Sequence, residues 1–522
     1  MKVEPVNLDN RVLQLLQRAA EHFQSLHQQA YLVGGSLRNI LLAEPCSDWD
    51  IVTTGDVPSI ARLLADKLHG HYAHLHEKAS RVIIPPSSAE ESTEIIFDIA
   101  PLKGRSLEND LRQRDFTINA IAAPLEDVVR HLTANDPIQT MRLIDPLHGL
   151  ADIAARRLKA VDSHVFQHDP LRMLRAVRLM MRYHLSIDSS TEGLLMRDSP
   201  LLPQVASERI HDELYAILAP NGAAERLQFL DAHGLLTTLI PEFIPARGMA
   251  QPQPHYWDVL DHSIQAVRAI EQLATLLQQS PAVIQQSPLE NHAACNLVTI
   301  QQLLIEAEEQ GIFQRAMLTS PPMKLATLLH DIGKPATYTI DENDHIHFYG
   351  HPQAGVPLVQ HITKRLSVNT QDRRLVQQVT SHHMRPGQLG QQGTAITPRA
   401  IRRYFVDLGP TGIAVALFSL ADHIATRGPT FGTPEQQAVT IASWEQHITT
   451  VCLLLSSYIR DRASVIPPQL ISAEELMRRL NLTPGPLIGQ LLDQIAEAQA
   501  EGTVHSKEEA LWLAEEKLQH SD

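Results

Sequence analysis

The spacing of apolar residues changes along the chain and separates a mixed region from several helical blocks. Residues 1–28 carry apolar positions at helical spacing and predict one amphipathic helix. Strand-like and helical patterns then alternate up to about residue 145, where the turn-rich DPLHG at 145–149 closes the region. From 151 to about 245 apolar residues recur every three or four positions, which predicts helices throughout. This pattern predicts an α+β head followed by a helical region.

Proline-rich residues 241–257, PEFIPARGMAQPQPHYW, mark a boundary before a second helical block at 255–428. Residues 429–470 then lead to a last helical piece at about 471–522. We expect four domains, namely a head at 1–150, a neck and body at 151–250, a helical domain at 251–430 and a helical tail at 431–522.

Residues 32–54, LVGGSLRNILLAEPCSDWDIVTT, carry the first candidate chemistry. Gly34-Gly35 ends an apolar run, a short helical segment follows, and a new strand then carries Asp48 and Asp50. Residues two apart on a strand share a face, and two carboxylates on one face repel unless cations such as a metal pair neutralise them. The glycines let the backbone approach a triphosphate. The stretch therefore predicts nucleotidyl transfer with two metal ions, although a solvated strand end shows the same Asp-x-Asp pattern.

Two further segments support this interpretation. TEIIFDIA at 93–100 predicts a strand whose Asp98 supplies a third carboxylate. LRQRDFTINA at 111–120 places Arg114, Asp115 and Asn119 at a predicted helix start, where Arg114 and Asn119 reach the phosphates and sugar of a nucleotide. The alternative for this second segment is a capped helix stabilised by ion pairs.

These motifs resemble those of the bacterial (class II) tRNA nucleotidyltransferase and poly(A) polymerase family, within the polymerase-β-like nucleotidyltransferases. The matching stretches occur in the family's order, within about residues 25–250, and are VGGSLRNILL, SDWDIVTTG, FDIAPLKG, RQRDFTINA, LIDPLHGLADI, HDPLRMLRAVRL and SERIHDEL. The resemblance implies a polymerase-β-like head followed by an all-helical neck and body. It also implies that Asp48 and Asp50 bind Mg²⁺ and that Asp98 completes the catalytic set.

The same resemblance assigns a nucleotide-binding set to the head and the start of the neck. Its members are Gly34, Gly35, Arg38, Arg114, Asp115, Asn119, Asp169, Arg172 and Arg175. Asp169 and Arg172 are expected to select CTP or ATP, since an acceptor and donors can imitate a Watson–Crick edge. The chain departs from the family at Asn39, where an Asp is usual, at Pro101-Leu102-Lys103, and at His168, where a Glu is usual. None of these departures removes a metal ligand.

A metal-ligand pattern lies in the block after residue 255. His262 falls on a predicted helix, His330-Asp331 lies in LATLLHDIGKPATY, and Asp422 lies in FSLADHI. Neutral imidazole together with carboxylate suits a first-row divalent metal. The block resembles the HD-domain phosphohydrolases, which implies the ligand set His262, His330, Asp331 and Asp422 and a metal such as Ni²⁺, Mn²⁺ or Co²⁺. Additional histidines, namely His351 and His382-His383, are candidates for a second metal.

Charge and composition limit the partners. The formal net charge of −15 opposes nucleic-acid binding overall, yet Arg172, Arg175, Arg178 and Arg182 form a local basic stripe at helical spacing. We expect Arg178 and Arg182 to bind RNA. The tail resembles the C-terminal element of HD-bearing tRNA nucleotidyltransferases, and its Gly485 and Gly489 either expose backbone N–H groups to a tRNA phosphate or permit close helix packing.

Cysteine content and hydropathy indicate the compartment. The three cysteines, Cys46, Cys295 and Cys452, lack a Cys-x-x-Cys spacing, which argues against a disulfide framework and against structural zinc. No apolar run approaches the roughly 18 residues of a membrane span, and MKVEPVNLDN lacks the features of a signal peptide. We expect a cytoplasmic protein without a membrane or obligate protein partner.

The sequence therefore predicts an enzyme that adds C and A to the tRNA 3′ end from CTP and ATP, with a further phosphohydrolase activity. The nearest alternative is a poly(A) polymerase or an enzyme that adds only CC or only A. Two other classes stay open, namely an HD phosphohydrolase with a non-catalytic nucleotide-binding module, and a tRNA-binding scaffold without catalysis. The set Asp48, Asp50 and Asp98 argues against the non-catalytic nucleotide-binding module. Metal dependence of the activity would distinguish an enzyme from a tRNA-binding scaffold.

Overall fold

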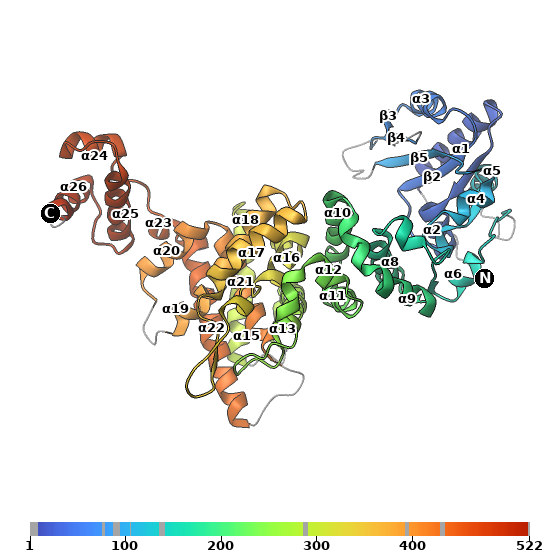
Figure 1. The fold of residues 1–522 in the computed structure, drawn as a ribbon. Helices are drawn as coiled ribbons and strands as arrows, with labels where there is room; N and C mark the ends of the chain where they lie inside the picture. The colour runs from blue at the N-terminus through green and yellow to red at the C-terminus, as the bar shows by residue number, and fades with distance from the viewer. Residues whose placement is uncertain are drawn as a thin grey trace. The chain divides into compact units, whose positions relative to one another are not determined.

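The computed structural model describes residues 9–75, 79–86, 94–104, 106–134, 141–285, 291–391, 396–427 and 434–519 (Figure 1). Its chain forms two compact units. The N-terminal unit comprises Met1–Val205 with His233–Leu235, and the C-terminal unit comprises Ala206–Ala232 with Leu236–Asp522. The expected domain limits at 150, 250 and 430 stay predictions.

A six-stranded sheet in the order β3-β4-β5-β2-β1-β6 forms the centre of the N-terminal unit. The strands are β1 Ala30–Val33, β2 Asp48–Thr53, β3 His71–His74, β4 Ser80–Ile84, β5 Ile95–Pro101 and β6 Ala122–Pro124. Only β2 and β5 pair in parallel, while the other neighbours are antiparallel. Side chains alternate along these strands, so that Trp49, Ile51 and Phe97 are buried in the core.

Helices surround this sheet and continue beyond it. Those of the N-terminal unit are α1 Asn10–Ser25, α2 Gly34–Leu42, α3 Val57–Leu68, α4 Leu107–Arg112, η1 Thr117–Asn119, α5 Leu125–Ala134, α6 Gly149–Ala154, α7 Val165–His168, α8 Arg172–Tyr183, α9 Ser189–Asp198 and η3 Ser199–Gln204. In Figure 1, α1, α3 and α5 border the strands, and α1 packs against both of the other helices. The predicted first helix is confirmed over α1, while residues 1–8 lie outside the described ranges.

The expectation of helices throughout 151–245 is wrong at one place. A two-stranded parallel pair, β7 (Arg157–Leu158) with β8 (Ser186–Ile187), brackets α7 and α8. Each strand is only two residues long, and such a strand is too short for its alternation to show in the sequence. The pair holds the two ends of this segment together.

The C-terminal unit is almost wholly helical. Its elements begin with α10 Ser207–Leu218, α11 Ala223–Ala232, α12 Leu235–Leu239, η4 Pro241–Ala246, α13 Val259–Leu276, α14 Pro281–Gln285, α15 Asn291–Glu309, η5 Arg315–Thr319, α16 Pro321–Leu329, η6 Lys334–Thr337, β9 Thr339–Ile340 and β10 Ile346–His347. They continue with α17 His351–Arg365, α18 Thr370–His382, α19 Arg385–Gln391, α20 Pro398–Leu408, α21 Thr411–Ala425, α22 Pro434–Arg460, α23 Arg462–Val465, α24 Ala473–Leu480, α25 Pro486–Ala500 and α26 Lys507–Gln519.

A buried ion pair joins several of these helices. Lys324 on α16 lies 2.7 Å from the carboxylate of Glu271 on α13, and both side chains are at most 8% exposed. Lys324 also donates to the carbonyls of Leu218 and Pro220 at the end of α10, while Glu271 accepts the backbone N–H groups that begin α11. Each charge thus satisfies a helix terminus as well as its partner.

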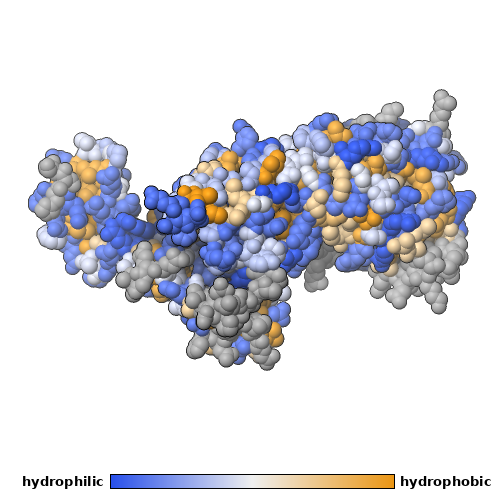
Figure 2. All heavy atoms as spheres, turned by 60° about the horizontal axis from the view of Figure 1, so that its bottom comes forward, coloured by the Kyte–Doolittle hydropathy of each residue, from blue (hydrophilic) through white to orange (hydrophobic). Residues whose placement is uncertain are grey.

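The visible surface is mainly polar. Hydrophilic residues predominate on the face shown in Figure 2, where hydrophobic residues form small separate patches. Within the described ranges no single helix has the length and composition to cross a membrane, although α20 and α21 meet those criteria as a pair bent by 106°.

Candidate functional sites

Parallel pairing of β2 with β5 brings the predicted carboxylates together. The register sets Asp50 directly opposite Asp98, and Asp48 precedes Asp50 by two residues on the same face of β2. Burial raises the pKa of Asp50, and the charges of Asp98 and Asp48 raise it further against the opposing effect of Arg114. The predicted third carboxylate therefore does lie beside the first two, in a cluster that a cation would stabilise.

The glycine motif approaches this cluster closely. Gly34 has a φ of +66°, and a Cβ placed on it would lie 2.9 Å from Arg114 Nη1 and 3.1 Å from Asp50 Oδ2. The backbone N–H of Gly35 donates to the Asp50 carboxylate, and the Asp50 N–H donates to Ser36 Oγ at 2.8 Å. Both glycines are thus placed so that the start of α2 comes next to the carboxylates.

Arg81 on β4 is a site residue that the sequence patterns did not single out. Its guanidinium donates two hydrogen bonds to Asp98, from Nε at 2.7 Å and from Nη2 at 2.8 Å. Strand pairing places Arg81 opposite Asp98 on the edge away from Asp50. The stretch SRVII shows no alternation of apolar and polar residues, so the sequence indicated neither the face of Arg81 nor its partner.

The predicted helix start at Arg114 and Asp115 is wrong. Helix α4 ends at Arg112, and the two residues follow in a turn, with Asn119 at the end of η1. Arg114 forms an ion pair of 2.9 Å with Asp110, four residues earlier, so the capped and paired alternative describes part of the segment. Asp115 accepts a hydrogen bond from Asn119 Nδ2 and lies 3.1 Å from the guanidinium of Arg175.

A cavity of about 260 Å³ lies beside these residues and is named here the head pocket. It is lined by Val52, Ala100, Pro101, Lys103, Asp110, Gln113, Arg114, Asp115, Asp169, Arg172 and Arg175. Val52 and Ala100 stand two residues beyond Asp50 and Asp98, on the same faces of their strands. The head pocket therefore continues the carboxylate face of the sheet and brings together five predicted nucleotide-binding residues.

Arg172 is held in a defined place in the head pocket. Its guanidinium donates to the carbonyls of Gln113 at 3.0 Å and Arg114 at 3.2 Å. The His168 side chain is exposed, although it directly precedes Asp169. Of the predicted basic stripe, Arg172 and Arg175 thus face the head pocket, Arg178 is half-buried, and Arg182 lies exposed with its guanidinium 5.3 Å from the ring of Tyr183.

Arg38 lies in a buried network instead of on the surface of the head pocket. Its guanidinium donates to Asn119, to Asn39 and to the Tyr183 hydroxyl at 2.6–2.8 Å, and it lies 4.4 Å from the Tyr183 ring centroid. The Tyr183 hydroxyl in turn donates to Asn39 at 2.9 Å. This placement favours a positioning role that ties α2 to the end of α8, and direct nucleotide binding by Arg38 stays a prediction.

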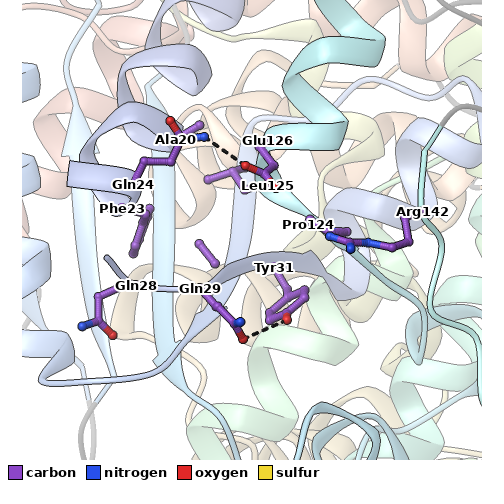
Figure 3. A pocket seen from close by; sticks show the side chains of 11 residues that line it. Ala20, Phe23, Gln24, Gln28, Gln29, Tyr31, Pro124, Leu125, Glu126 and Arg142 are labelled. Atoms are coloured by element: carbon purple, nitrogen blue, oxygen red, sulfur yellow. Dashed lines mark hydrogen bonds between the residues drawn. The ribbon is translucent and has the colours of Figure 1, made fainter. Parts of the chain in front are cut away.

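A second cavity of about 170 Å³ lies between α1, β1 and α5 (Figure 3). Hydrogen bonds from Gln24 to Glu126 and from Tyr31 to Gln29 cross its lining. None of the predicted site residues lines it, so the head pocket is the candidate for nucleotide binding.

The expected ligands of the second site meet in the C-terminal unit. His262 Nε2 lies 2.9 Å from Asp422 Oδ1, and His330 Nε2 lies 3.0 Å from Asp331 Oδ2 and 3.4 Å from Asp422 Oδ1. They come from α13, from the residues just after α16 and from α21, and α13 packs against both α16 and α21. We call the group of His262, His330, Asp331 and Asp422 the HD centre.

Two more histidines join the HD centre, and one expected candidate does not. His351 Nε2 and His383 Nε2 lie 3.2 and 3.6 Å from Asp331 Oδ1 and 3.2 Å from each other. His382 contacts Arg385 instead, because adjacent residues on α18 point in different directions. Lys334, which the sequence patterns did not assign, lies 2.5 Å from Asp331 Oδ2.

The orientation of the imidazoles fits a metal. The Nδ1 atoms of His330, His351 and His383 each hydrogen-bond a backbone carbonyl at 2.8–2.9 Å, which directs their Nε2 atoms toward Asp331. The facing ligand atoms of His262, His330 and Asp422 lie within 4.8 Å of one another, as do those of His330, Asp331 and His383. Imidazole and carboxylate atoms that converge in this way suit a first-row divalent ion.

The tail forms a small helical cluster with its own apolar core around Leu476, Leu491 and Ala510. A Cβ placed on Gly485 or Gly489 meets nothing within 4 Å, and Gly485 has an extended φ of 177°. Close helix packing therefore does not explain either glycine, and both lie exposed at the start of α25.

Comparison with known families supports both parts of the chain. The family described as Poly A polymerase head domain matches residues 30–159, the HD domain family matches 319–426, and the family described as probable RNA and SrmB-binding site of polymerase A matches 184–247. An A-adding tRNA nucleotidyltransferase of Deinococcus radiodurans is 29% identical over 489 residues, covering 92% of this chain and 94% of that protein.

A multifunctional CCA protein of Teredinibacter turnerae is 30% identical over 369 residues, which are 68% of this chain and 74% of the relative. The chain belongs to the tRNA nucleotidyltransferase and poly(A) polymerase family. A solved structure of the Thermotoga maritima CCA-adding enzyme complexed with tRNA has the same fold, with a TM-score of 0.55 at 18% identity over 98% of this chain and 96% of that one. The expected α+β head and helical remainder are confirmed for this family member.

When a metal ion binds to the metal-free protein, we expect the HD centre to release a proton. Although burial lowers it, the carboxylates of Asp331 and Asp422 raise the pKa of His330 to about 10. The charged imidazole then stabilises the metal-free fold below the unfolded pKa of 6.5, and this contribution is lost as the pH rises through about 10. A metal needs the neutral imidazole, so Mn²⁺ affinity should rise roughly tenfold per unit between pH 6 and 8.

Calorimetry in two buffers of different ionisation enthalpy measures this proton. The His330→Ala variant provides the control and should lose both the proton release and most of the affinity. Metal binding by the unaltered protein that is independent of pH would contradict the expected coupling.

Proposed function

We propose that the protein adds C and A nucleotides to the 3′ end of tRNA without a template. The carboxylate cluster of Asp48, Asp50 and Asp98 beside the head pocket carries this proposal. Family membership supports it, as do the printed names of an A-adding enzyme and a multifunctional CCA protein among the relatives.

Asp48 and Asp50 would hold the Mg²⁺ ions, which when bound supply charge neutralisation at the triphosphate and activation of the 3′-hydroxyl. The chain's own residues provide the placement. Arg114 and Lys103 line the head pocket with positive charge suited to phosphates, while Gly34 and Gly35 leave room beside Asp50. Asp98, held by Arg81, completes the carboxylate set at the edge of β5.

Nucleotide selection is assigned to the same head pocket. Asp169 presents an acceptor and Arg172 presents donors, and the two backbone carbonyls bound to Arg172 fix its plane. Asp115 and Asn119 would position the sugar, with Arg175 holding Asp115. Tyr183, Arg38 and Asn39 would keep α8 in register with the glycine motif.

Incubation with tRNA lacking CCA, labelled CTP or ATP, and magnesium tests the proposal, with sequencing of the products. Addition of CCA is the expected outcome. A product ending in CC, a single A added only to tRNA that already ends in CC, or a long A tract would identify a partial enzyme or a poly(A) polymerase. If no nucleotide is added, the proposal that the head catalyses nucleotide addition is wrong.

Replacement of Asp50 by Asn should abolish addition without loss of the fold. A missing ligand removes several kcal/mol of charge stabilisation, so the rate should fall by at least roughly 100-fold. The melting temperature should stay equal or rise, because burial and the neighbouring carboxylates already raise the pKa of Asp50. Single-turnover kinetics and thermal melting measure both effects, with exposed Asp66→Asn on α3 as the matched control. Near-normal transfer by the Asp50→Asn enzyme would refute the site.

The HD centre supports a second function, a metal-dependent phosphohydrolase acting on 2′,3′-cyclic phosphate or phosphate at an RNA end. His262, His330, Asp331 and Asp422 would hold one ion, and His351 and His383, which lie close to Asp331, are candidates to hold a second. The bound metal, Ni²⁺, Mn²⁺ or Co²⁺, supplies a water of lowered pKa. Removal of a terminal phosphate restores the 3′-hydroxyl that the head requires.

A double variant, His330→Ala with Asp331→Ala, tests this function and its independence. With nickel, manganese or cobalt, the unaltered protein should hydrolyse RNA ending in a 2′,3′-cyclic phosphate, and the double variant should lose at least roughly 100-fold of this rate. Nucleotide addition should persist in the double variant, and hydrolysis should persist in Asp50→Asn. No metal-stimulated hydrolysis by the unaltered protein would end the phosphohydrolase proposal.

The tail is proposed to bind tRNA phosphate at Gly485 and Gly489, with Arg178 and Arg182 binding RNA from α8. Gly489→Ala separates binding from folding, because its Cβ would meet nothing within 4 Å. Alanine should stabilise α25 by about 0.5–1 kcal/mol. Its methyl group would keep a phosphate from approaching the backbone and should weaken tRNA binding roughly tenfold, the effect of losing one hydrogen bond to a charged acceptor. The matched control is Gly193→Ala on α9, which is equally open. Anisotropy titration showing unchanged tRNA affinity in Gly489→Ala would exclude this contact.

A further inference from the structure

Exposed aromatic side chains occur on chain segments next to the HD centre. Among the described residues four aromatic rings are strongly exposed, namely Tyr256 at 57%, Tyr338 at 39%, Tyr349 at 76% and Trp512 at 65%. Three of them stand close in sequence to the HD centre. Tyr349 precedes the ligand His351 by two residues, Tyr338 follows Lys334 by four, and Tyr256 precedes His262 by six. Three of the four exposed rings therefore lie on chain segments that also carry residues of the HD centre.

Tyr349 is fixed in place and is not merely exposed. Its ring stacks on that of His347, with the centroids 4.9 Å apart and the planes inclined by 13°. Because consecutive Cα atoms are about 3.8 Å apart, the Cα of Tyr349 lies within roughly 8 Å of that of His351. One face of the Tyr349 ring is thus covered by imidazole, while most of the side chain faces solvent beside a proposed metal ligand.

The neighbouring residues link this stack to the HD centre. The carbonyl of Phe348 accepts the Nδ1 proton of His351 at 2.8 Å, and the Phe348 ring lies 5.8 Å from that of Tyr338. Lys334 places its ammonium 5.5 Å from the Phe348 ring while it contacts Asp331. The aromatic residues that flank the β9–β10 hairpin are therefore connected by these contacts to the metal-binding residues.

A second aromatic segment contacts the HD centre from the chain before α13. The ring of His255 packs edge-on against His262 with centroids 5.1 Å apart, and Tyr256 follows it. The Tyr256 N–H donates to the carbonyl of Thr426, four residues after Asp422. Tyr256 and Tyr349 thus come from two segments that are each anchored to proposed ligands.

The chemistry of this arrangement selects a flat, π-rich ligand that carries a phosphate. Base–aromatic stacking contributes roughly 1–3 kcal/mol per base and needs no particular base identity. A phosphate is favoured close by, because Lys334 and the histidines surround Asp331. The hairpin carboxylate of Asp341 lies 2.9 Å from His347 and 3.4 Å from His345.

We propose that Tyr349, backed by His347 and assisted by Tyr256, stacks the nucleobase of the nucleotide whose phosphate enters the HD centre. The HD centre then acts on nucleotide ends and discriminates against phosphate esters that lack a base. This inference rests on the proposed phosphohydrolase function and adds to it a recognition element.

Steady-state hydrolysis by the metal-loaded full-length protein tests the stacking. Three probes are compared, namely an RNA trinucleotide ending in a 2′,3′-cyclic phosphate, the same trinucleotide with an abasic terminal ribose, and a 2′,3′-cyclic mononucleotide. Tyr349→Ala should raise KM roughly tenfold for the two probes with a terminal base, with little change in kcat, and should leave the abasic probe unaffected. Tyr349→Phe should restore the original KM, and Ile340→Ala, an exposed side chain on the same hairpin, should not change it.

Equal KM changes on the abasic probe would overturn the proposal, as would an effect confined to the trinucleotide, which would assign the contact to a preceding base. If the unaltered protein hydrolyses none of the probes, the phosphohydrolase proposal is wrong. A binding measurement then tests whether Tyr349 stacks on the base. Anisotropy of a labelled trinucleotide 3′-phosphate on the Mn²⁺-loaded protein should then still show roughly tenfold weaker binding for Tyr349→Ala, and no such loss with the abasic form. Equal affinities would overturn the stacking as well.

Discussion

Repulsion between neighbouring carboxylates is the constraint around which the head is built. Parallel pairing of β2 with β5 sets Asp50 directly against Asp98, with Asp48 on the same face. Burial and these like charges raise the pKa of Asp50, so the cluster costs free energy in the absence of a cation. Arg81 on one side and Arg114 on the other offset part of this cost. The glycine motif and the head pocket are placed by the same two strands, so the geometry for a metal and the geometry for a nucleotide have one origin.

The HD centre meets the same constraint with a different chemistry. Its carboxylates are surrounded by imidazoles, and backbone carbonyls fix three of these rings through Nδ1 so that Nε2 points inward. Imidazole and carboxylate together suit a transition metal, while carboxylates alone suit magnesium. The two centres belong to separate compact units.

Basic residues in the neck serve internal structure as much as binding. Arg172 contacts backbone carbonyls and Arg175 contacts Asp115. Such residues raise the local positive charge of the head pocket while they hold α8 to the sheet. A chain with a net charge of −15 can therefore present a nucleotide site, because placement and not the total charge determines the local field.

Local spacing in the sequence was sufficient to determine the elements that carry the chemistry. The alternation around Asp48, Asp50 and Asp98 predicted two strands with carboxylates on one face, and Gly34-Gly35 predicted the close approach of α2, since both depend on neighbours within a few residues. The pattern of His262, His330, Asp331 and Asp422 predicted a ligand set that does meet. Local pattern failed at Arg114, where a helix start was predicted but a turn follows the end of α4, and at the two-residue strands β7 and β8.

Only the tertiary structure decided which distant residues face each other. The pairing of Arg81 with Asp98, the contact of Tyr183 with Arg38 and the approach of His383 to Asp331 all depend on strand register or helix packing. Strand register and helix packing are set by burial across the whole unit. The side chains involved show no periodic pattern of their own in the sequence. The stack of Tyr349 on His347 is of the same kind, because it exists only where the hairpin folds back beside the HD centre.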